Sequence, residues 1–198
     1  MANLTTLEKM DRVVLWVICA ILFYSAAILL AAYVSGAHLG EWVWERHQNQ
    51  FSWYSRPLFI IPAAYYAFRR KLLYIIGIMT LLASSLFWFA PPTTVSPAVQ
   101  SYLEWEQQFF FANASKLPLF ALTMAVAAFL FLLFFAFWQR NIWYGLAVIN
   151  LGTLLKIMVS LVFGQEAGMA AIVPSLSSLL VINAIAWVLL RRSRGLEN

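Results

Sequence analysis

Long apolar runs separated by short polar segments form the main pattern of this chain. Five runs reach the length of about 20 residues that an α-helix needs to cross the hydrocarbon core of a bilayer. A sixth run is shorter and carries Pro57 and Pro62, the second of which would kink a helix. We therefore expect an all-α integral membrane protein, a six-transmembrane helical bundle. The expected spans are residues 13–35, 53–68, 71–90, 118–138, 142–163 and 168–190.

Basic residues gather at alternate ends of these runs. They lie on one side of the membrane only if the chain crosses six times, and a re-entrant second segment would spoil this bias. The positive-inside bias therefore predicts that both termini are cytoplasmic, in a plasma or inner membrane. A re-entrant hairpin at 53–68 remains the alternative. The basic positions are Lys9 and Arg12, Arg69 to Lys71, Arg140, and Arg191, Arg192 and Arg194.

The outer segment between the third and fourth spans carries a helical pattern over residues 97–111. Apolar residues, among them Val99 and Leu103, recur with a period near 3.6, while Glu104 falls on the opposite side. Ser96 suits the cap position and is followed by a proline at the first helical position. The pattern predicts an amphipathic helix lying at the outer interface. Glu106 breaks the pattern because it projects into the apolar side, unless the helix frays or rotates there.

Lys156 is the costly residue within the predicted spans, because a central lysine costs about 2.5–3.5 kcal/mol on insertion scales. It belongs to a polar stripe on the fifth span, which normally faces a bundle interior or a wet cavity. No acidic residue falls inside the six predicted spans. We therefore expect its partner to be an outer loop, a bound anion or a neighbouring protomer, with snorkelling to the headgroups as the alternative. The stripe consists of Asn150, Thr153, Lys156 and Ser160.

Glu106 is the partner that we expect for Lys156, because both charges lie on the outer half of the protein on sides where an unpaired charge is costly. Other carboxylates at the expected outer mouth compete for this role, and His38 lies near some of them. These outer-mouth residues are His38, Glu41, Glu45, Glu104 and Glu166.

Composition supports the membrane assignment and removes other classes. The chain of 198 residues is 63% apolar and only 11% charged, which excludes a soluble monomer and a disordered chain. The net charge of +5 comes from the ends of the spans, so nucleic acid is not an expected partner and the lipid bilayer is. Cys19 is the single cysteine, so no internal disulfide forms.

Candidate chemistry is sparse. If the first helix continued beyond the membrane, His38, Glu41 and Glu45 would share a face and could bind a transition metal. Gly36 and Gly40 favour an end to the helix there, so a solvated loop is expected and no metal site is assigned. No hydrolase or phosphate-loop motif is present, so no catalytic residue is assigned and the cofactor stays unknown.

Three functions remain in competition. The first is a transport or channel protein with an outer-facing vestibule centred on Lys156, which favours an anion or an anionic group. The second is a non-enzymatic scaffold or accessory subunit of a larger membrane complex. The third is an intramembrane enzyme acting on lipid, with Glu106 and Lys156 as acid and base. The small residues Ala27, Ala31 and Ser35 on the first span favour a homo-oligomer or a partner subunit.

Overall fold

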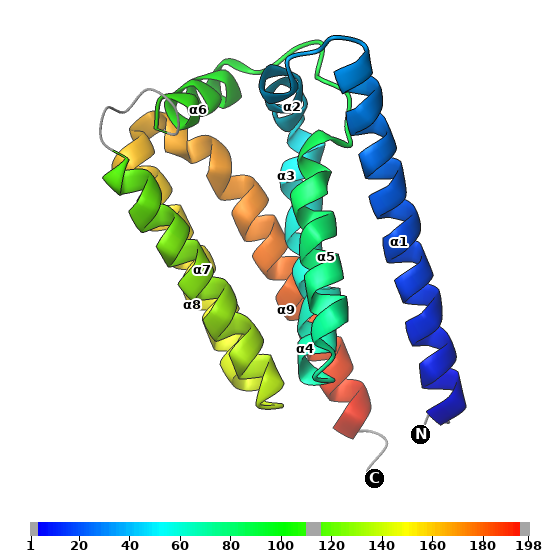
Figure 1. The fold of residues 1–198 in the computed structure, drawn as a ribbon. Coiled ribbons are helices and arrows are strands. Elements are labelled where there is room, and N and C mark those ends of the chain that lie inside the picture. Colours follow the sequence, from blue (N-terminus) through cyan, green and yellow to red (C-terminus); the bar gives the residue numbers. More distant parts are fainter. Residues whose placement is uncertain (1–3, 110–115, 195–198) are drawn as a thin grey trace. The chain divides into compact units, whose positions relative to one another are not determined.

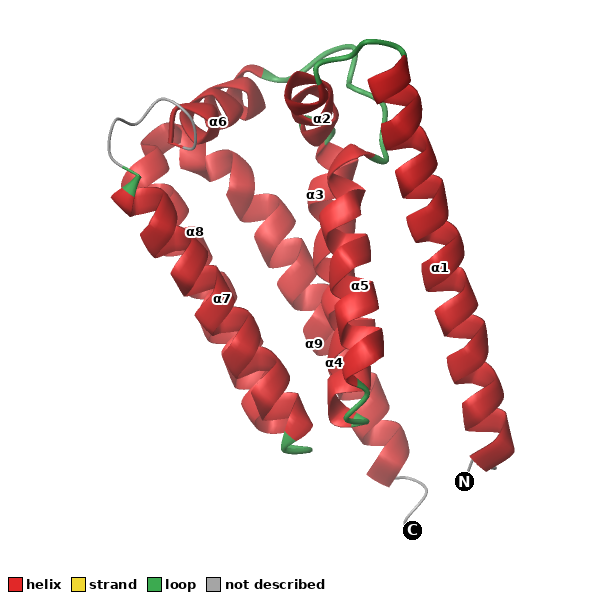
Figure 2. Ribbon diagram, in the orientation of Figure 1, coloured by secondary structure: helices red, strands yellow, loops and turns green. Residues whose placement is uncertain are grey.

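The computed structural model describes residues 4–109 and 116–194, and nearly all of them are helical (Figure 1, Figure 2). No strand occurs in these two stretches, which confirms the all-α prediction. The chain divides into two compact units. The first unit comprises Met1–Tyr66 and Lys71–Pro92, and the second comprises Ala67–Arg70 and Thr93–Asn198.

The first unit is built on one long helix, α1, which ends at Val34 and is followed by a turn at Gly36. Gly36 has a φ of +83°, and its neighbours close the helix end through hydrogen bonds from Ser35 N to Ala31 O and from Ala37 N to Ala32 O. A broken helical hairpin follows. The elements in chain order are α1 (Leu4–Val34), α2 (Leu39–His47), α3 (Gln50–Ser55), η1 (Arg56–Phe59), α4 (Ile60–Phe68), α5 (Leu72–Ser84) and η2 (Ser85–Phe87).

The buried positions of α1 recur every seven residues. Over the part of α1 for which burial is described, residues 6–34, only four side chains are buried. A seven-residue repeat places them on one seam, which is the arrangement of a helix packed along a partner. The partner is α5, because the Cβ of an alanine at Gly77 would lie 3.0 Å from the Cγ2 atom of Ile18. The four seam residues are Asp11, Ile18, Ser25 and Ala32.

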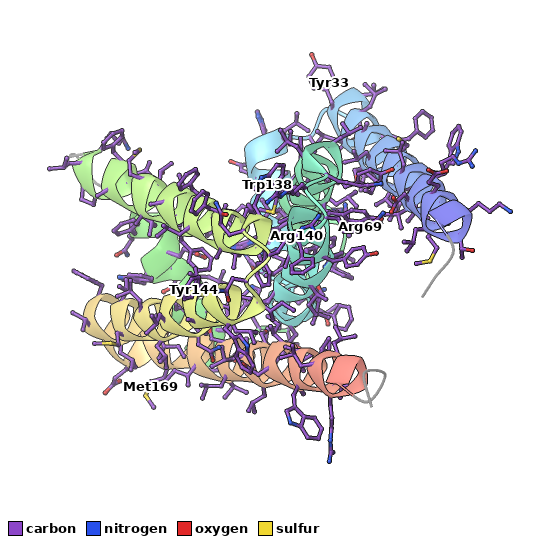
Figure 3. The ribbon with its side chains drawn as sticks, turned by 90° about the horizontal axis from the view of Figure 1, so that it is seen from below. Tyr33, Arg69, Trp138, Arg140, Tyr144 and Met169 are labelled. Carbon is purple, nitrogen blue, oxygen red and sulfur yellow. The ribbon has the colours of Figure 1, made fainter. Side chains whose placement is uncertain are left out.

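In the second unit, two glycines allow the two helices of a helical hairpin to pack closely. A Cβ at Gly152 would overlap the ring of Phe129, and one at Gly145 would overlap the ring of Phe137. Each glycine therefore forms a notch on α8 that receives an aromatic ring of α7. Figure 3 shows Arg140 at the turn of this hairpin. The elements are α6 (Pro97–Gln107), α7 (Leu117–Trp138), α8 (Ile142–Gly168), η4 (Met169–Ala171) and α9 (Ile172–Arg194).

Four helices in the described stretches are long and apolar enough to cross a membrane, which supports a multi-pass membrane protein. Their bounds match four of the six predicted spans. The structure does not support the predicted spans 53–68 and 71–90 as continuous crossing helices. The four helices are Thr6–Val34, Leu117–Trp138, Ile142–Gly164 and Met169–Arg191.

The two unsupported spans fail for different physical reasons. The first is interrupted at η1, where Pro57 occupies an early position, while Pro62 falls in the first turn of α4 and does not break it. The second contains the apolar stretch Leu72–Phe87, which is shorter than the length of about 20 residues for a spanning helix. The prediction of six spans is therefore confirmed only for four.

Candidate functional site

Helix α6 lies over one end of α8 (Figure 1), and its position at a membrane interface stays a prediction. It begins at Pro97 as expected and ends at Gln107, whereas residues 110–111 of the prediction lie outside the described stretches. Val99 and Leu103 are each 4% exposed, which confirms the apolar face. Glu104 is exposed and accepts a hydrogen bond of 3.0 Å from Gln100 Nε2. The side chain of Ser96 does not cap the helix, so that detail of the prediction is wrong.

Two aromatic side chains fix α6 on a small-residue surface of α8. The side chains of Tyr102 and Ser160 share a hydrogen bond. A Cβ at Gly164 would lie 3.8 Å from the indole of Trp105, so the ring rests directly over this glycine. Ser160 and Gly164, one helical turn apart, are both buried. We call these two residues the α6 seat.

The seat is held by a tight fold of the chain after the span. A Cβ at Gly168 would overlap the carbonyl oxygen of Ser160, so the chain comes back against the backbone of a residue eight positions earlier. No side chain other than hydrogen fits at that approach. Met169 follows at the end of α8 opposite to the hairpin turn (Figure 3). The close approach at Gly168 therefore packs the chain after the span against the backbone of Ser160 in the seat.

Glu106 lies close enough to Tyr102 for its charge to act on the phenol. Burial, followed by the negative charge of Glu106, raises the pKa of Tyr102 to about 12, and the hydrogen bond with Ser160 opposes part of this shift. Tyr102 is therefore a neutral hydroxyl at physiological pH. Glu106 is half-buried, one helical turn from Tyr102 on α6.

The predicted polar stripe divides into a structural part and a part near the seat. Asn150 and Asn183 form a reciprocal pair, in which each Nδ2 donates to the other's Oδ1 at 3.2 and 3.1 Å. This pair joins α8 to α9, so Asn150 acts in packing. Thr153 is half-buried. Ser160 is buried at the seat, and Lys156 is exposed one turn before it on α8.

The site therefore brings together Tyr102, Glu106 and Ser160, with Lys156 on the adjoining turn. The pairing of Lys156 with Glu106 stays a prediction. The site thus contains the ammonium group of Lys156, the carboxylate of Glu106 and the hydroxyl groups of Tyr102 and Ser160. Helix α6 covers it with aromatic side chains.

The remaining outer-mouth residues do not form a metal site. Helix α1 ends at Val34 and His38 precedes α2, so the continuous helical face suggested for His38, Glu41 and Glu45 does not exist. All three are exposed, and so is Glu166 on α8. No group of three potential metal ligands occurs among the residues that the structure describes.

Sequence reasoning missed Asp11. It lies in the apolar helix Thr6–Val34, two residues before the predicted span 13–35, and is only 3% exposed. Asp11 Oδ2 forms an ion pair with Lys71 Nζ, and Oδ1 accepts a hydrogen bond of 3.3 Å from the Tyr66 hydroxyl. The sequence contains one signal for the burial of Asp11. Asp11, Ile18 and Ser25 are spaced seven residues apart, which places them on the same buried seam of the helix.

A second missed feature is Arg56, which lies within the short second apolar run. Its Nη1 lies 3.0 Å from Nδ1 of His47, and the Nε and Nη2 atoms are buried. Trp53 Nε1 donates a hydrogen bond of 3.2 Å to His47 O. The guanidinium thus joins α2 to η1 at the point where the helical run breaks.

No family model, curated protein or solved structure matches this chain.

Proposed function

We propose that the protein is a small transport or channel protein whose polar vestibule lies at the α6 end of α8 and is centred on Lys156. The observation that supports this most directly is the contact of α6 with α8, in which Tyr102 shares a hydrogen bond with Ser160 one turn from Lys156. Helix α6 is amphipathic and packs on the polar end of α8. It is therefore placed to cover the entrance of a polar pathway along α8.

Charge decides the class of substrate in this proposal. A lysine ammonium at the base of a vestibule favours an anion or the anionic group of a larger molecule. The hydroxyl group of Thr153 adds a hydrogen-bond donor on the same side of α8. Glu106 supplies a competing carboxylate that would shield Lys156 when no anion is bound.

We further propose that the broken hairpin of the first unit also crosses the membrane, giving six crossings with both termini cytoplasmic in a plasma or inner membrane. Lys71 contacts Asp11 near one end of α1, and Trp88 Nε1 donates to Ser25 Oγ at 2.9 Å farther along. The 14 residues from Asp11 to Ser25 cover about 21 Å at about 1.5 Å per residue. The hairpin thus follows α1 over most of the thickness of a hydrocarbon core of about 30 Å.

The two tight turns support the same orientation. Arg70 and Arg140 have φ angles of +57° and +58°, in the left-handed region where glycine is the least costly residue. An arginine at both positions is consistent with selection for charge at the cytoplasmic side.

Orientation is tested by cysteine labelling in a Cys19→Ala background. A membrane-impermeant maleimide should modify Ser101→Cys in intact cells, and modify Arg70→Cys and Arg140→Cys only after permeabilisation. Modification of Arg140→Cys in intact cells would reverse the orientation. Modification of Arg70→Cys in intact cells, or its protection even after permeabilisation, would contradict the crossing of the hairpin.

Transport is tested with the purified protein in liposomes, using a chloride-sensitive dye inside the vesicles. The proposal predicts flux above that of empty vesicles, a loss of about tenfold or more in Lys156→Met, and retention in Lys156→Arg. Lys116→Met is the matched control, because Lys116 is an exposed lysine that precedes α7 outside the stripe. Anion flux that is absent, or unaffected by Lys156→Met, would contradict the proposal.

One observation favours the alternative of an accessory subunit. All six residues from Thr123 to Ala128 on α7 are exposed. Six consecutive positions cover every side of a helix, and small residues among them permit a close helix approach. A second copy or another membrane subunit would pack there. Solution mass measured after mild extraction from native membranes, with Ala125→Phe as the disrupting variant, tests this alternative.

A further inference from the structure

Asp11 is a carboxylate enclosed within the first unit, far along the chain from the site on α8. Its side chain is 4% exposed. Each carboxylate oxygen has its own donor, Tyr66 for Oδ1 and Lys71 for Oδ2. Two separately directed donors hold the carboxylate in one orientation, with the ammonium on one side and the phenol on the other.

A cluster of tyrosine rings adjoins this carboxylate through Tyr66. Tyr66 is 3% exposed and stacks on Tyr74, with ring centroids 4.4 Å apart and an interplanar angle of 13°. Tyr65 meets Tyr66 edge-on at 5.1 Å. The Lys71 ammonium lies 5.6 Å from the centroid of Tyr74, within the range of a cation–π interaction. A carboxylate together with aromatic rings is the combination that recognises an ammonium group.

The side chain of Lys71 reaches Asp11 from the turn before α5. It is the residue immediately before α5, its backbone donates to Tyr66 O in the tight turn, and its side chain is 34% exposed. The lysine stem therefore enters from solvent and delivers its ammonium to the buried carboxylate. A buried ion pair adds little stability over well-packed apolar residues, so its presence argues for a specific role of the pair.

We propose that Asp11, Tyr66 and Tyr74 form a binding site for a primary ammonium group, and that Lys71 occupies this site as a tethered ligand. A free primary amine, or a molecule that carries one, replaces the Lys71 ammonium and releases α1 from the turn before α5. This site is distinct from the proposed anion vestibule and does not depend on it.

The first experiment removes the tethered ligand. Lys71→Ala leaves space for methylammonium beside Asp11, and the unfolding midpoint of the purified full chain in detergent is measured as methylammonium chloride is added. At about ten times the dissociation constant, linkage predicts a rise of about 3–5 °C, which grows with the logarithm of the methylammonium concentration beyond that point. The double variant Asp11→Asn/Lys71→Ala should show no such rise. Equal responses of the two variants, or none in Lys71→Ala, would overturn the proposal.

Comparator cations separate a site from an effect of salt. Tetramethylammonium has the same charge but no N–H donor, so it should not reproduce the methylammonium response at equal ionic strength. A matching rise with tetramethylammonium or sodium would show that the cluster does not select a primary ammonium, and would contradict the proposal.

The second experiment uses the unmodified chain, so its outcome does not depend on the folding of a variant. Acetylation of lysines by a water-soluble reagent is followed residue by residue with mass spectrometry. Lys71 should react more slowly than the exposed Lys9, and methylammonium should accelerate its reaction by displacing it from Asp11. Tetramethylammonium should have no such effect. An acetylation rate of Lys71 that methylammonium leaves unchanged would overturn the competition.

Discussion

The two units join their helices by different chemistry. In the first unit, charged and hydroxyl side chains connect α1 to the broken hairpin, through Asp11 with Lys71 and through Ser25 with Trp88. In the second unit, glycine notches and the neutral pair of Asn150 and Asn183 connect long unbroken helices. Charged contacts thus occur in the first unit, where the helical run is interrupted. Neutral contacts occur in the second unit, where the helices are continuous.

This difference follows from the cost of burying charge. A continuous apolar helix packs through close approach of backbones and through weakly polar pairs, which need no ionised group. A helix interrupted near a turn leaves polar backbone and allows a long side chain such as Lys71 to reach in from solvent. The first unit is therefore expected to be sensitive to changes of charge, and the second to changes of volume.

The largest volume effect is expected at Gly168. Gly168→Ala places a Cβ into the carbonyl of Ser160, which is backbone and cannot turn aside. We expect a loss of about 3 kcal/mol in the free energy of unfolding. Gly40→Ala is the matched control, because a Cβ at Gly40 meets nothing within 4 Å. Denaturant unfolding in detergent micelles measures both, and equal stability of the two variants would mean that the end of α8 is not tightly folded.

The corresponding charge effect is expected at Asp11. Lys71→Met should cost about 3 kcal/mol, because it leaves a buried carboxylate without its ammonium, and Asp11→Asn combined with Lys71→Met should cost less than that single change. Glu8→Gln, at an exposed position on the same helix, should change the stability little. A double variant as unstable as the sum of the single ones would show that the two side chains are not coupled.

The features that the sequence could and could not predict follow the same division. The length of an apolar stretch is enough to predict each of the four long helices. The helical period of apolar and polar residues is enough to predict the amphipathic α6. A disturbance of the second run was predicted at Pro62, but the run is interrupted at η1 instead, because Pro57 by itself suits a first helical turn and gives no sign that the helix changes there. Asp11 was overlooked because a charge between Lys9 and Arg12 resembles an ordinary polar flank of a span.

The candidate site was predicted only in part for a related reason. The helical period places Lys156 and Ser160 on one side of α8, and it gives α6 its apolar face. It does not give the contact between Tyr102 and Ser160, nor that between Trp105 and Gly164, because these join two helices that lie far apart in the sequence. Asn150 was assigned to the polar stripe, whereas its partner Asn183 shows that it serves packing.

A smaller effect should come from the neutral pair of the second unit. Asn150→Leu, Asn183→Leu and the double variant form a thermodynamic cycle, and we expect a coupling of about 0.6–2 kcal/mol, as for other hydrogen bonds between membrane helices. Ser177→Ala is a suitable control on α9, because that hydroxyl donates within its own helix to Val173 O. A coupling near zero would remove the amide pair from the contacts that join α8 to α9.

The smallest effect concerns the titration of Tyr102. Its raised pKa means that the folded chain retains a proton which the unfolded chain loses, so the free energy of unfolding should fall as the pH rises from about 10 to about 12. Glu106→Gln removes the negative charge and should shift the pKa of Tyr102 back toward its ordinary value of 10.0. Tyrosinate absorbance, taken as the difference from Tyr102→Phe, measures this shift. An unchanged pKa would place Glu106 too far away to act at the seat.

In the proposed transport function, Lys156 faces a water-filled vestibule rather than lipid. In a Cys19→Ala background, Lys156→Cys should react with a water-soluble methanethiosulfonate, whereas Leu155→Cys, exposed on a different side of α8, should not. A cysteine is too short to reach the headgroups, so snorkelling cannot mimic this result. Reaction at position 156 alone, from the α6 side of the membrane, is the predicted outcome. Protection of both positions, or equal reaction at both, would contradict the vestibule.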